Sequence, residues 1–414
     1  MRLFVAAVLV VETVFAVQGP PTPEELALEQ KLWLDEYPDQ TWKVVGQYPT
    51  APGTVHATVF SADEARGLYN HSAHIAWHDG LFHATWSNQR YDEDAAGERV
   101  LYASSPDGLK WSAPRELVPS LSPETPWGYA GVYSASLDFV SYDGRLFGSG
   151  FTSEILAWES MDREKRSRVR TDECVFPVYG GRIRVYREIK SDGSFGRLFS
   201  PEREKLPKEL LCPVFSQAAV EPGFTLPPPA WGTGDVLTKY PKRRLNEPTA
   251  WKRADGTFVM LLRDDSNSFR KWLSLSADGW KWSCPCVTDI YDARSASCAA
   301  TLDDGTVLLI TNPRGKGIND PVLGWRDRDP LTISISRDGL HFGSTHTVKE
   351  GYHRFKVDLK TGPRGRGGSA AYPSVLVKNG YCYVIYSLGK EDIGLTRIPL
   401  AALLKKSEKA SYEE

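Results

Sequence analysis

Ionisable and aromatic side chains recur at one kind of place in this chain, directly before short runs of strand-forming residues. Glu247 precedes Pro248 in one such place, Tyr372 precedes a proline in another, and His71 and His74 belong to a third. Carboxylate, phenol and imidazole groups that share one cavity can carry acid–base or nucleophilic chemistry. We therefore predict Glu247, Tyr372 and His71 as catalytic residues and His74 as a substrate-binding residue.

Arginines and other polar groups occupy comparable places. Arg263 and Arg314 each follow the second strand-forming run of their units, and Arg294 precedes the next such run. Guanidinium groups bind carboxylates in a fork, so these arginines predict a clamp for an acidic substrate. Tyr133 adds a candidate proton carrier before a further strand. Trp127 lies in a long loop and suits stacking on a sugar ring.

Several of these residues also have a purely structural interpretation. Glu247 could cap a neighbouring backbone turn, and Tyr372 could be a core aromatic whose hydroxyl is bonded. His71 suits a solvated loop as well as a proton carrier, and His74 suits a satisfied residue of an inner strand. The residue types alone leave both interpretations open.

A repeated turn identifies the elements that must position these side chains. The pattern Ser-x-Asp-Gly-x-x-aromatic occurs at residues 105–111, 276–282 and 336–342. The Asp side chain can accept hydrogen bonds from the backbone just after it, and Gly adopts positive φ without steric cost. The spacing of the copies fits structural units of about 60 residues.

Each unit contains short β-branched and aromatic runs bounded by Gly, Asp and Pro, which predict strands. In the first unit these runs are residues 74–77, 81–86 and 99–103, and two later units repeat the order. Four-stranded units repeated radially form a β-propeller. We predict an all-β, six-bladed β-propeller over residues 45–402. Residues that precede the inner strands should then converge on one face.

The two ends of the chain differ from the repeats. Residues 1–16 combine a positive start, an apolar stretch and small residues at a cleavage site, which is typical of a signal peptide. We therefore expect a secreted or periplasmic protein, and the apolar stretch is too short for a membrane span. We expect residues 17–44 to form a short helical leader and residues 403–414 a charged tail.

Composition narrows the functional classes. The 414 residues include 35 Gly and 28 Pro with 41% hydrophobic residues, as in a turn-rich globular protein. The formal net charge is −2, so nothing favours nucleic acid as a partner. The six cysteines lack the spacing of a zinc knuckle. Four histidines fall on two predicted strands and point in different directions. They are His71, His74, His78 and His83. We therefore expect neither a metal nor a cofactor.

The three turns resemble the Asp-box, or BNR repeat, of the sialidase (neuraminidase) superfamily, whose fold is a six-bladed propeller. The resemblance covers about residues 60–400, and it includes the segments at 246–249, 262–264 and 372–374. It implies an acidic oligo- or polysaccharide as the substrate of a glycoside hydrolase. It also implies Glu247 with Tyr372 as a nucleophile pair, Arg263 and Arg314 in an arginine triad, and an Asp as acid/base.

The first repeat departs from sialidases, because Asn70-His71 stands where they have an Arg-Ile-Pro motif. This entrance and residues 86–90 are similar to the first blade of propeller polysaccharide lyases such as ulvan lyases. That resemblance implies β-elimination on a uronate with His71 and Tyr133 as base and acid. Three hypotheses follow: a sialidase-like glycosidase, which we prefer, a polysaccharide lyase, and a glycan-binding propeller without catalysis.

Overall fold

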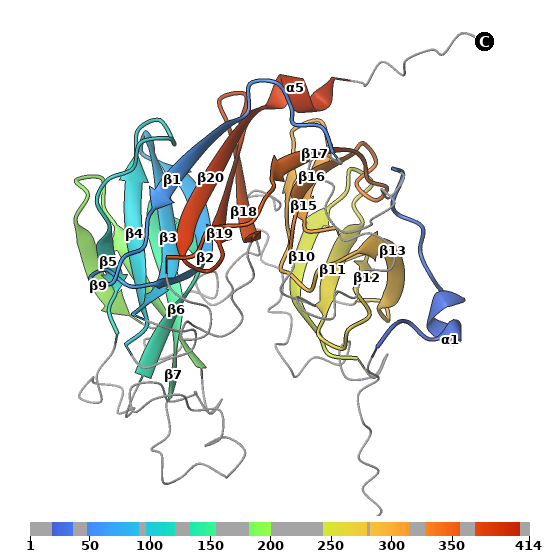
Figure 1. Cartoon of the computed structure of the whole chain (residues 1–414), viewed down its shortest axis with the longest axis horizontal. Coiled ribbons are helices and arrows are strands. Elements are labelled where there is room, and N and C mark those ends of the chain that lie inside the picture. Colours follow the sequence, from blue (N-terminus) through green and yellow to red (C-terminus); the bar gives the residue numbers. More distant parts are fainter. Residues whose placement is uncertain are drawn as a thin grey trace, which may run out of the picture.

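The computed structural model describes residues 19–35, 48–90, 97–120, 132–154, 182–199, 243–279, 282–313, 328–356 and 369–405. These residues form five antiparallel sheets of four strands each, together with two short helices (Figure 1). The all-β prediction is therefore confirmed.

Four of the sheets are built from strands that are consecutive in the sequence. The first two sheets comprise β2 (Tyr69–His78), β3 (Leu81–Gln89), β4 (Arg99–Ser105) and β5 (Arg115–Val118), then β6 (Val132–Tyr142), β7 (Arg145–Glu154), β8 (Arg182–Ile189) and β9 (Phe195–Phe199). The next two comprise β10 (Leu245–Lys252), β11 (Phe258–Asp264), β12 (Arg270–Ser276) and β13 (Cys286–Tyr291), then β14 (Cys298–Thr301), β15 (Val307–Thr311), β16 (Leu331–Ser336) and β17 (Gly343–Lys349).

The fifth sheet joins the two ends of the chain. It contains β18 (Ala370–Lys378), β19 (Tyr381–Leu388), β20 (Asp392–Pro399) and, as its outer strand, β1 (Val55–Phe60). β1 pairs antiparallel with β20, with Val55 opposite Arg397. Without β1, β20 would be an edge strand with unpaired backbone groups. The pairing also joins the start of the repeats to their end.

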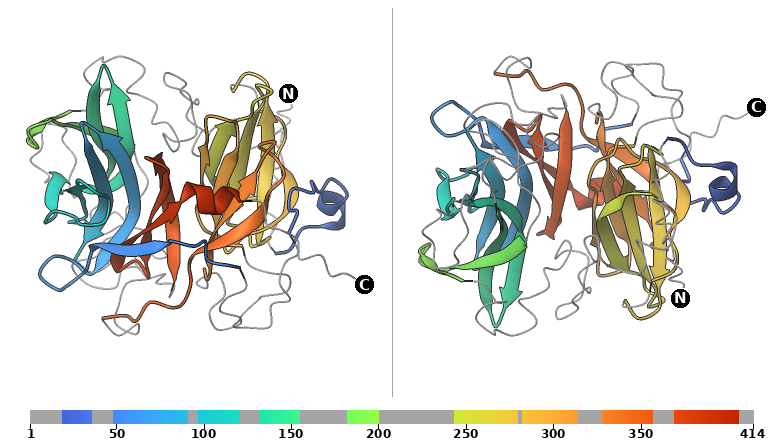
Figure 2. Two further views of the ribbon diagram at one scale, coloured as in Figure 1. Left: turned by 90° about the horizontal axis from the view of Figure 1, so that it is seen from above. Right: turned by 90° about the horizontal axis from the view of Figure 1, so that it is seen from below.

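The sheets lie side by side in a row (Figure 2). From one end, their order is β10–β13, β14–β17, β18–β20 with β1, β2–β5 and β6–β9. The first strands of successive sheets contact one another along the row, so β10, β14, β18, β2 and β6 form its inner side. Residues 200–242, which connect the two ends of the row, lie outside the described residues. Five such sheets are consistent with a propeller, and the count of six stays a prediction.

The Ser-x-Asp-Gly turns connect the third and fourth strands of three sheets. Each Ser hydroxyl donates to the Asp carboxylate two residues later, at 3.0, 3.1 and 2.9 Å. The turns also contact the neighbouring sheet: Trp251 Nε1 donates to the Gly339 carbonyl at 2.7 Å, and a Cβ at Gly108 would lie 2.6 Å from the Tyr383 ring. The turn therefore recurs because it closes one sheet against the next.

The leader is less helical than its composition suggests. Helix α1 (Pro23–Leu26) begins after Thr22, which caps it, and spans one turn. Beyond it, Gln30 and Trp33 form single bridges with the outer part of two sheets. Helix α5 (Leu400–Leu404) follows β20. Among the described residues, no helix has the length and apolar character needed to span a membrane.

Arg243 anchors the leader to the sheets. Its fully buried guanidinium contacts Glu25 at 2.7 Å and Asp264 at 3.1 Å. Replacing Arg243 with Met would leave two buried carboxylates without their cation, so we expect the free energy of unfolding to fall by about 3–5 kcal/mol. Urea unfolding measures this loss. The exposed Arg66, paired with Asp63, is the matched control, and an Arg66→Met loss of equal size would contradict the prediction.

Candidate active site

Bulges in the inner strands aim the central side chains of the site. Glu247 in β10 and Tyr372 in β18 each begin a pair of residues that faces a single residue of the next strand. Their φ angles are 43° and 55°, in the left-handed region. A bulge redirects side chains locally. Residues with a strained backbone occur mainly at functional sites, where the surrounding structure fixes their conformation. Glu247 and Tyr372 are thereby turned away from the regular alternation of their strands.

Glu247, Tyr372 and Arg263 form one hydrogen-bonded group. The Tyr372 hydroxyl donates to Glu247 Oε1 at 2.5 Å. Arg263 Nη1 donates to Glu247 Oε2 at 2.6 Å and to the Tyr372 oxygen at 2.5 Å. The carboxylate thus accepts from both partners, and the phenol oxygen faces a fixed positive charge. This arrangement allows the carboxylate to take the phenol proton while Arg263 stabilises the negative charge that develops on oxygen.

The second terminal nitrogen of the Arg263 guanidinium, Nη2, also has a charged partner. Arg263 Nη2 lies 2.8 Å from Asp265 Oδ1, and Asp265 accepts a 2.6 Å hydrogen bond from Asn246. Arg294 Nη2 approaches the same carboxylate at 3.5 Å. Burial alone would lower the pKa of Arg263, but the charge of Glu247 and its other neighbours raises it well above its usual value. Arg263 therefore stays charged, and Arg294 joins the group through Asp265.

A buried ion pair supports the segment that carries Arg294. Lys271 Nζ donates to the Ser295 carbonyl at 2.7 Å and lies 3.2 Å from Asp292. Burial lowers the pKa of Lys271 and raises that of Asp292, and the attraction between the two charges opposes both changes. Arg294 has a φ of 54°. The pair thus fixes the backbone in the conformation that directs Arg294 towards the group.

Arg328 is a site residue that sequence reasoning missed. Its guanidinium lies 5.1 Å from the centre of the Tyr372 ring, and it donates to the Arg294 carbonyl at 3.0 Å. Asn312 holds its backbone through a 2.5 Å hydrogen bond to the Arg328 carbonyl. The available signal was an arginine between two aspartates directly before a strand. Arg314, the arginine predicted from the sequence, lies outside the described residues.

His71 lies against the nucleophile candidate. Its ring centre is 4.1 Å from that of Tyr372, and its Nδ1 is 2.7 Å from the Ser387 hydroxyl. Because Ser387 donates its own proton to the Ala371 carbonyl at 3.1 Å, the histidine must donate from Nδ1. We therefore assign the proton to Nδ1 and a lone pair to Nε2. Nε2 is buried without a hydrogen-bond partner within the described part of the chain.

The surroundings keep His71 neutral. Burial is the main cause that lowers its pKa well below the usual value, and the positive charges of Lys390, Arg328 and Arg263 act in the same direction. A neutral imidazole therefore occupies the position at which the sialidase motif would place an arginine. The positive charge next to Tyr372 comes from Arg263 and Arg328.

His74 faces another sheet. Its Nδ1 lies 3.6 Å from Asp138 Oδ1 on β6, and burial lowers its pKa to about 4. Trp127 and Arg314 lie outside the described residues. Tyr133 is described only through its backbone, which pairs with Ser153. The structure thus unites Glu247, Tyr372, Arg263, Arg294 and His71, and it places His74 beside Asp138.

The depressed pKa of His74 predicts a loss of stability in acid. An unfolded histidine titrates near 6.5 and folded His74 near 4, so between these values the unfolded state binds more protons. Stability should be complete above about pH 7 and fall by up to about 1 kcal/mol per pH unit as the pH drops towards 4. Urea unfolding at pH 7 and pH 5 measures the slope. His74→Gln should reduce it, and exposed His341→Gln should not; equal slopes in all three proteins would contradict the prediction.

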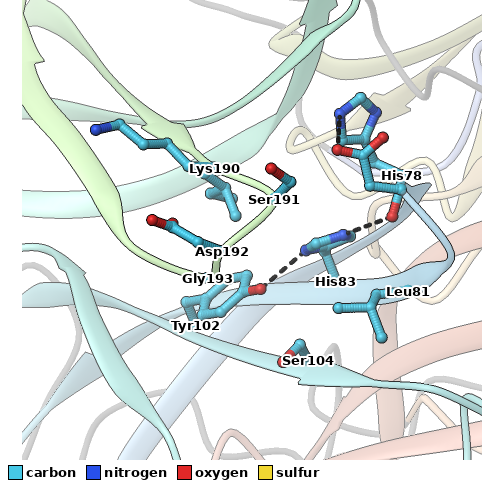
Figure 3. A pocket seen from close by; sticks show the side chains of 11 residues that line it. His78, Leu81, His83, Tyr102, Ser104, Lys190, Ser191, Asp192 and Gly193 are labelled. Atoms are coloured by element: carbon cyan, nitrogen blue, oxygen red, sulfur yellow. Dashed lines mark hydrogen bonds and ion pairs between the residues drawn. The ribbon is translucent and has the colours of Figure 1, made fainter.

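A pocket of about 160 Å³ lies at the other end of β2 from His71, between the β2–β3 and β8–β9 turns (Figure 3). There His83 Nε2 donates to the His78 carbonyl at 3.1 Å, which leaves Nδ1 to accept from the Tyr102 hydroxyl at 2.9 Å. These bonds hold His83 within the fold. Among the described residues, no three His, Cys, Asp or Glu side chains group as metal ligands.

Comparisons with known proteins agree with the all-β fold. Residues 213–384 match the family model of the BNR repeat-like domain. A sialidase structure matches with a TM-score of 0.58 and 21% identity, covering 86% of this chain and 34% of that one. Trypanosoma rangeli sialidase in complex with sialic acid matches with a TM-score of 0.50 and 15% identity, covering 86% and 60%. No curated protein sequence matches the chain significantly.

The predicted resemblance to the sialidase superfamily is therefore confirmed: the chain is similar in fold to sialidases, and residues 213–384 match the BNR repeat-like domain. It spans about a third of the first of these structures and 60% of the second.

Proposed function

We propose that this chain is a carbohydrate-active enzyme, and specifically a sialidase-like glycoside hydrolase that cleaves acidic glycans. The proposal is carried by one observation: the Tyr372 hydroxyl lies 2.5 Å from Glu247, and Arg263 donates to both. A hydroxyl bonded to an ionised base is an activated nucleophile.

The proposed reaction has two steps. Glu247 takes the Tyr372 proton as the phenol oxygen attacks the anomeric carbon, and the glycosidic carbon–oxygen bond breaks. The leaving oxygen takes a proton from an acid, the role that the resemblance gives to an aspartate. Water then attacks the anomeric carbon and gives a proton back to that aspartate. The bond between the sugar and Tyr372 breaks, and Tyr372 recovers its proton from Glu247 as the free sugar departs.

The substrate class follows from charge. Arg328 lies over the Tyr372 ring and Arg263 beside its oxygen, so a carboxylate next to the anomeric carbon would lie near the positive charge of two guanidinium groups. Neutral His71 adds no third charge. We infer an acidic oligo- or polysaccharide substrate, and a secreted or periplasmic location where such glycans are met.

A uronate lyase is the second candidate. One observation favours it: His71 is neutral with a lone pair on Nε2, the state that a base needs to remove the proton next to a uronate carboxylate. Tyr133 would then return a proton to the leaving oxygen. Arg263 or Arg328 would neutralise the carboxylate as the carbanion forms.

Incubation of the full chain with sialosides and with uronate polysaccharides tests these functions. New reducing ends or free acidic sugar without ultraviolet absorbance support the hydrolase. Absorbance from an unsaturated uronate supports the lyase and contradicts the hydrolase. Binding without either product supports the third possibility, a glycan-binding propeller without catalysis.

A further inference from the structure

The bulge that carries Glu247 and Tyr372 occurs a third time. In β2, two consecutive residues beginning at Ser72 face a single residue of β3. The bulges in β10 and β18 have the same two-to-one pairing. The first residue of each pair is left-handed, with φ of 50° at Ser72, 43° at Glu247 and 55° at Tyr372. Equivalent strands of the repeat thus present three equivalent side chains.

The residue types at these bulges are unusual for that backbone. Hairpin turns of the same chain place Asp79, Asp143 and Asn379 at positive φ, and Asp and Asn tolerate this conformation. Serine, glutamate and tyrosine do so less readily. Because the other two bulge residues are the hydrogen-bonded pair of the site, Ser72 occupies the position in its strand that is equivalent to theirs.

The surroundings of Ser72 fit that explanation. β2 lies beside β18 on the inner side of the row, and the residue before Ser72 is His71, whose ring lies 4.1 Å from that of Tyr372. Ser72 is half-buried. A hydroxyl at the edge of a cationic site can donate or accept, which suits the hydroxyl and ring oxygens of a sugar.

We propose that Ser72 is a substrate-binding residue of this site, and that its hydroxyl bonds an oxygen of the sugar ring held beside Tyr372. This rests on the proposed carbohydrate function, which it deepens by naming a third bulge position. The positive charge of Arg263 and Arg328 attracts the acid group, and Ser72 recognises a neutral oxygen of the same sugar.

Kinetics of three variants test the role. Ser72→Gly removes the hydroxyl and relieves the strain, whereas Ser72→Ala removes only the hydroxyl. Both should raise KM about tenfold with little change in kcat, as expected for one lost hydrogen bond. Ser344 also has a φ of 50° but is exposed on β17, so Ser344→Gly is the matched control and should leave KM unchanged. Normal kinetics for Ser72→Gly would overturn the proposal.

A second measurement tests whether Ser72 lies at this site, and it does not depend on enzyme activity. If Ser72 lies at the site beside Arg263 and Arg328, the thiol of a Ser72→Cys variant should react faster with a negatively charged thiosulfonate than with a positively charged one. The ratio of the two rates should exceed that of a Ser344→Cys variant by about tenfold. Equal ratios would overturn the placement of Ser72. An inactive wild type would contradict the hydrolase and lyase functions while leaving this result interpretable.

Discussion

Replacing Glu247 with Gln is expected to lower kcat by about a thousandfold on any substrate that the wild type hydrolyses. The amide has nearly the same shape and can still bond Tyr372, but it cannot accept the phenol proton. It also loses the negative charge that pairs with Arg263 at 2.6 Å. Steady-state kinetics with an aryl glycoside of an acidic sugar measure the loss.

The matched control is Glu116 on β5, an exposed glutamate paired with Arg99 at 3.1 Å. Glu116→Gln should keep full activity. If Glu247→Gln retains more than about a tenth of the wild-type kcat while Glu116→Gln is normal, Glu247 is not the base and the proposed mechanism is wrong.

A loss of kcat is likewise expected for Tyr372→Phe, which removes the hydroxyl. The pair acts as a unit, since the proton that leaves Tyr372 is the proton that Glu247 accepts. The double variant with Glu247→Gln should therefore be no slower than the slower single variant. Multiplied losses in the double variant would show two independent roles and would contradict a nucleophile pair.

The repeats could be predicted because their signals are local. Each Ser-x-Asp-Gly turn encodes its own hydrogen bonds, such as Asp107 Oδ1 accepting from the Leu109 and Lys110 amides at 2.8 Å. Strand periods and hairpin turns likewise depend on near neighbours. The leader was predicted less well, because its backbone bonds lie with strands far away in the sequence, as at Gln30 beside Thr288.

The site was predictable in its residue types but not in its contacts. Glu247 and Tyr372 could be chosen because each precedes a proline at the entrance to an inner strand. That they meet depends on the packing of different sheets, which no local pattern encodes. Arg328 was missed for the same reason: its partner is the Tyr372 ring, contributed by another sheet. The left-handed φ of Ser72 could not be predicted from the sequence either, because serine has no preference for the left-handed conformation.

Arg263→Leu is expected to lower kcat/KM for an acidic substrate by about a thousandfold. Arg263 is the residue that links Glu247, Tyr372 and Asp265, with contacts of 2.6, 2.5 and 2.8 Å. Without it, two carboxylates face each other without their shared cation, and the phenol oxygen loses the donor that stabilises its charge. Arg263→Lys keeps one charge but not the fork, so it should lie between the wild type and the leucine variant.

A neutral substrate separates the two tasks of Arg263. If the arginine binds the substrate carboxylate as well as holding the nucleophile pair, the wild type should prefer the acid over its methyl ester, and Arg263→Leu should lose most of that preference. Arg253, paired with Asp255 at the hairpin end of the same sheet, is the matched control, and Arg253→Leu should keep the preference. An unchanged preference in Arg263→Leu, with thermal unfolding like that of the wild type, would assign acid recognition to Arg328 alone. Arg263 would then act only on the nucleophile, because its arms are already engaged by Glu247 and Asp265.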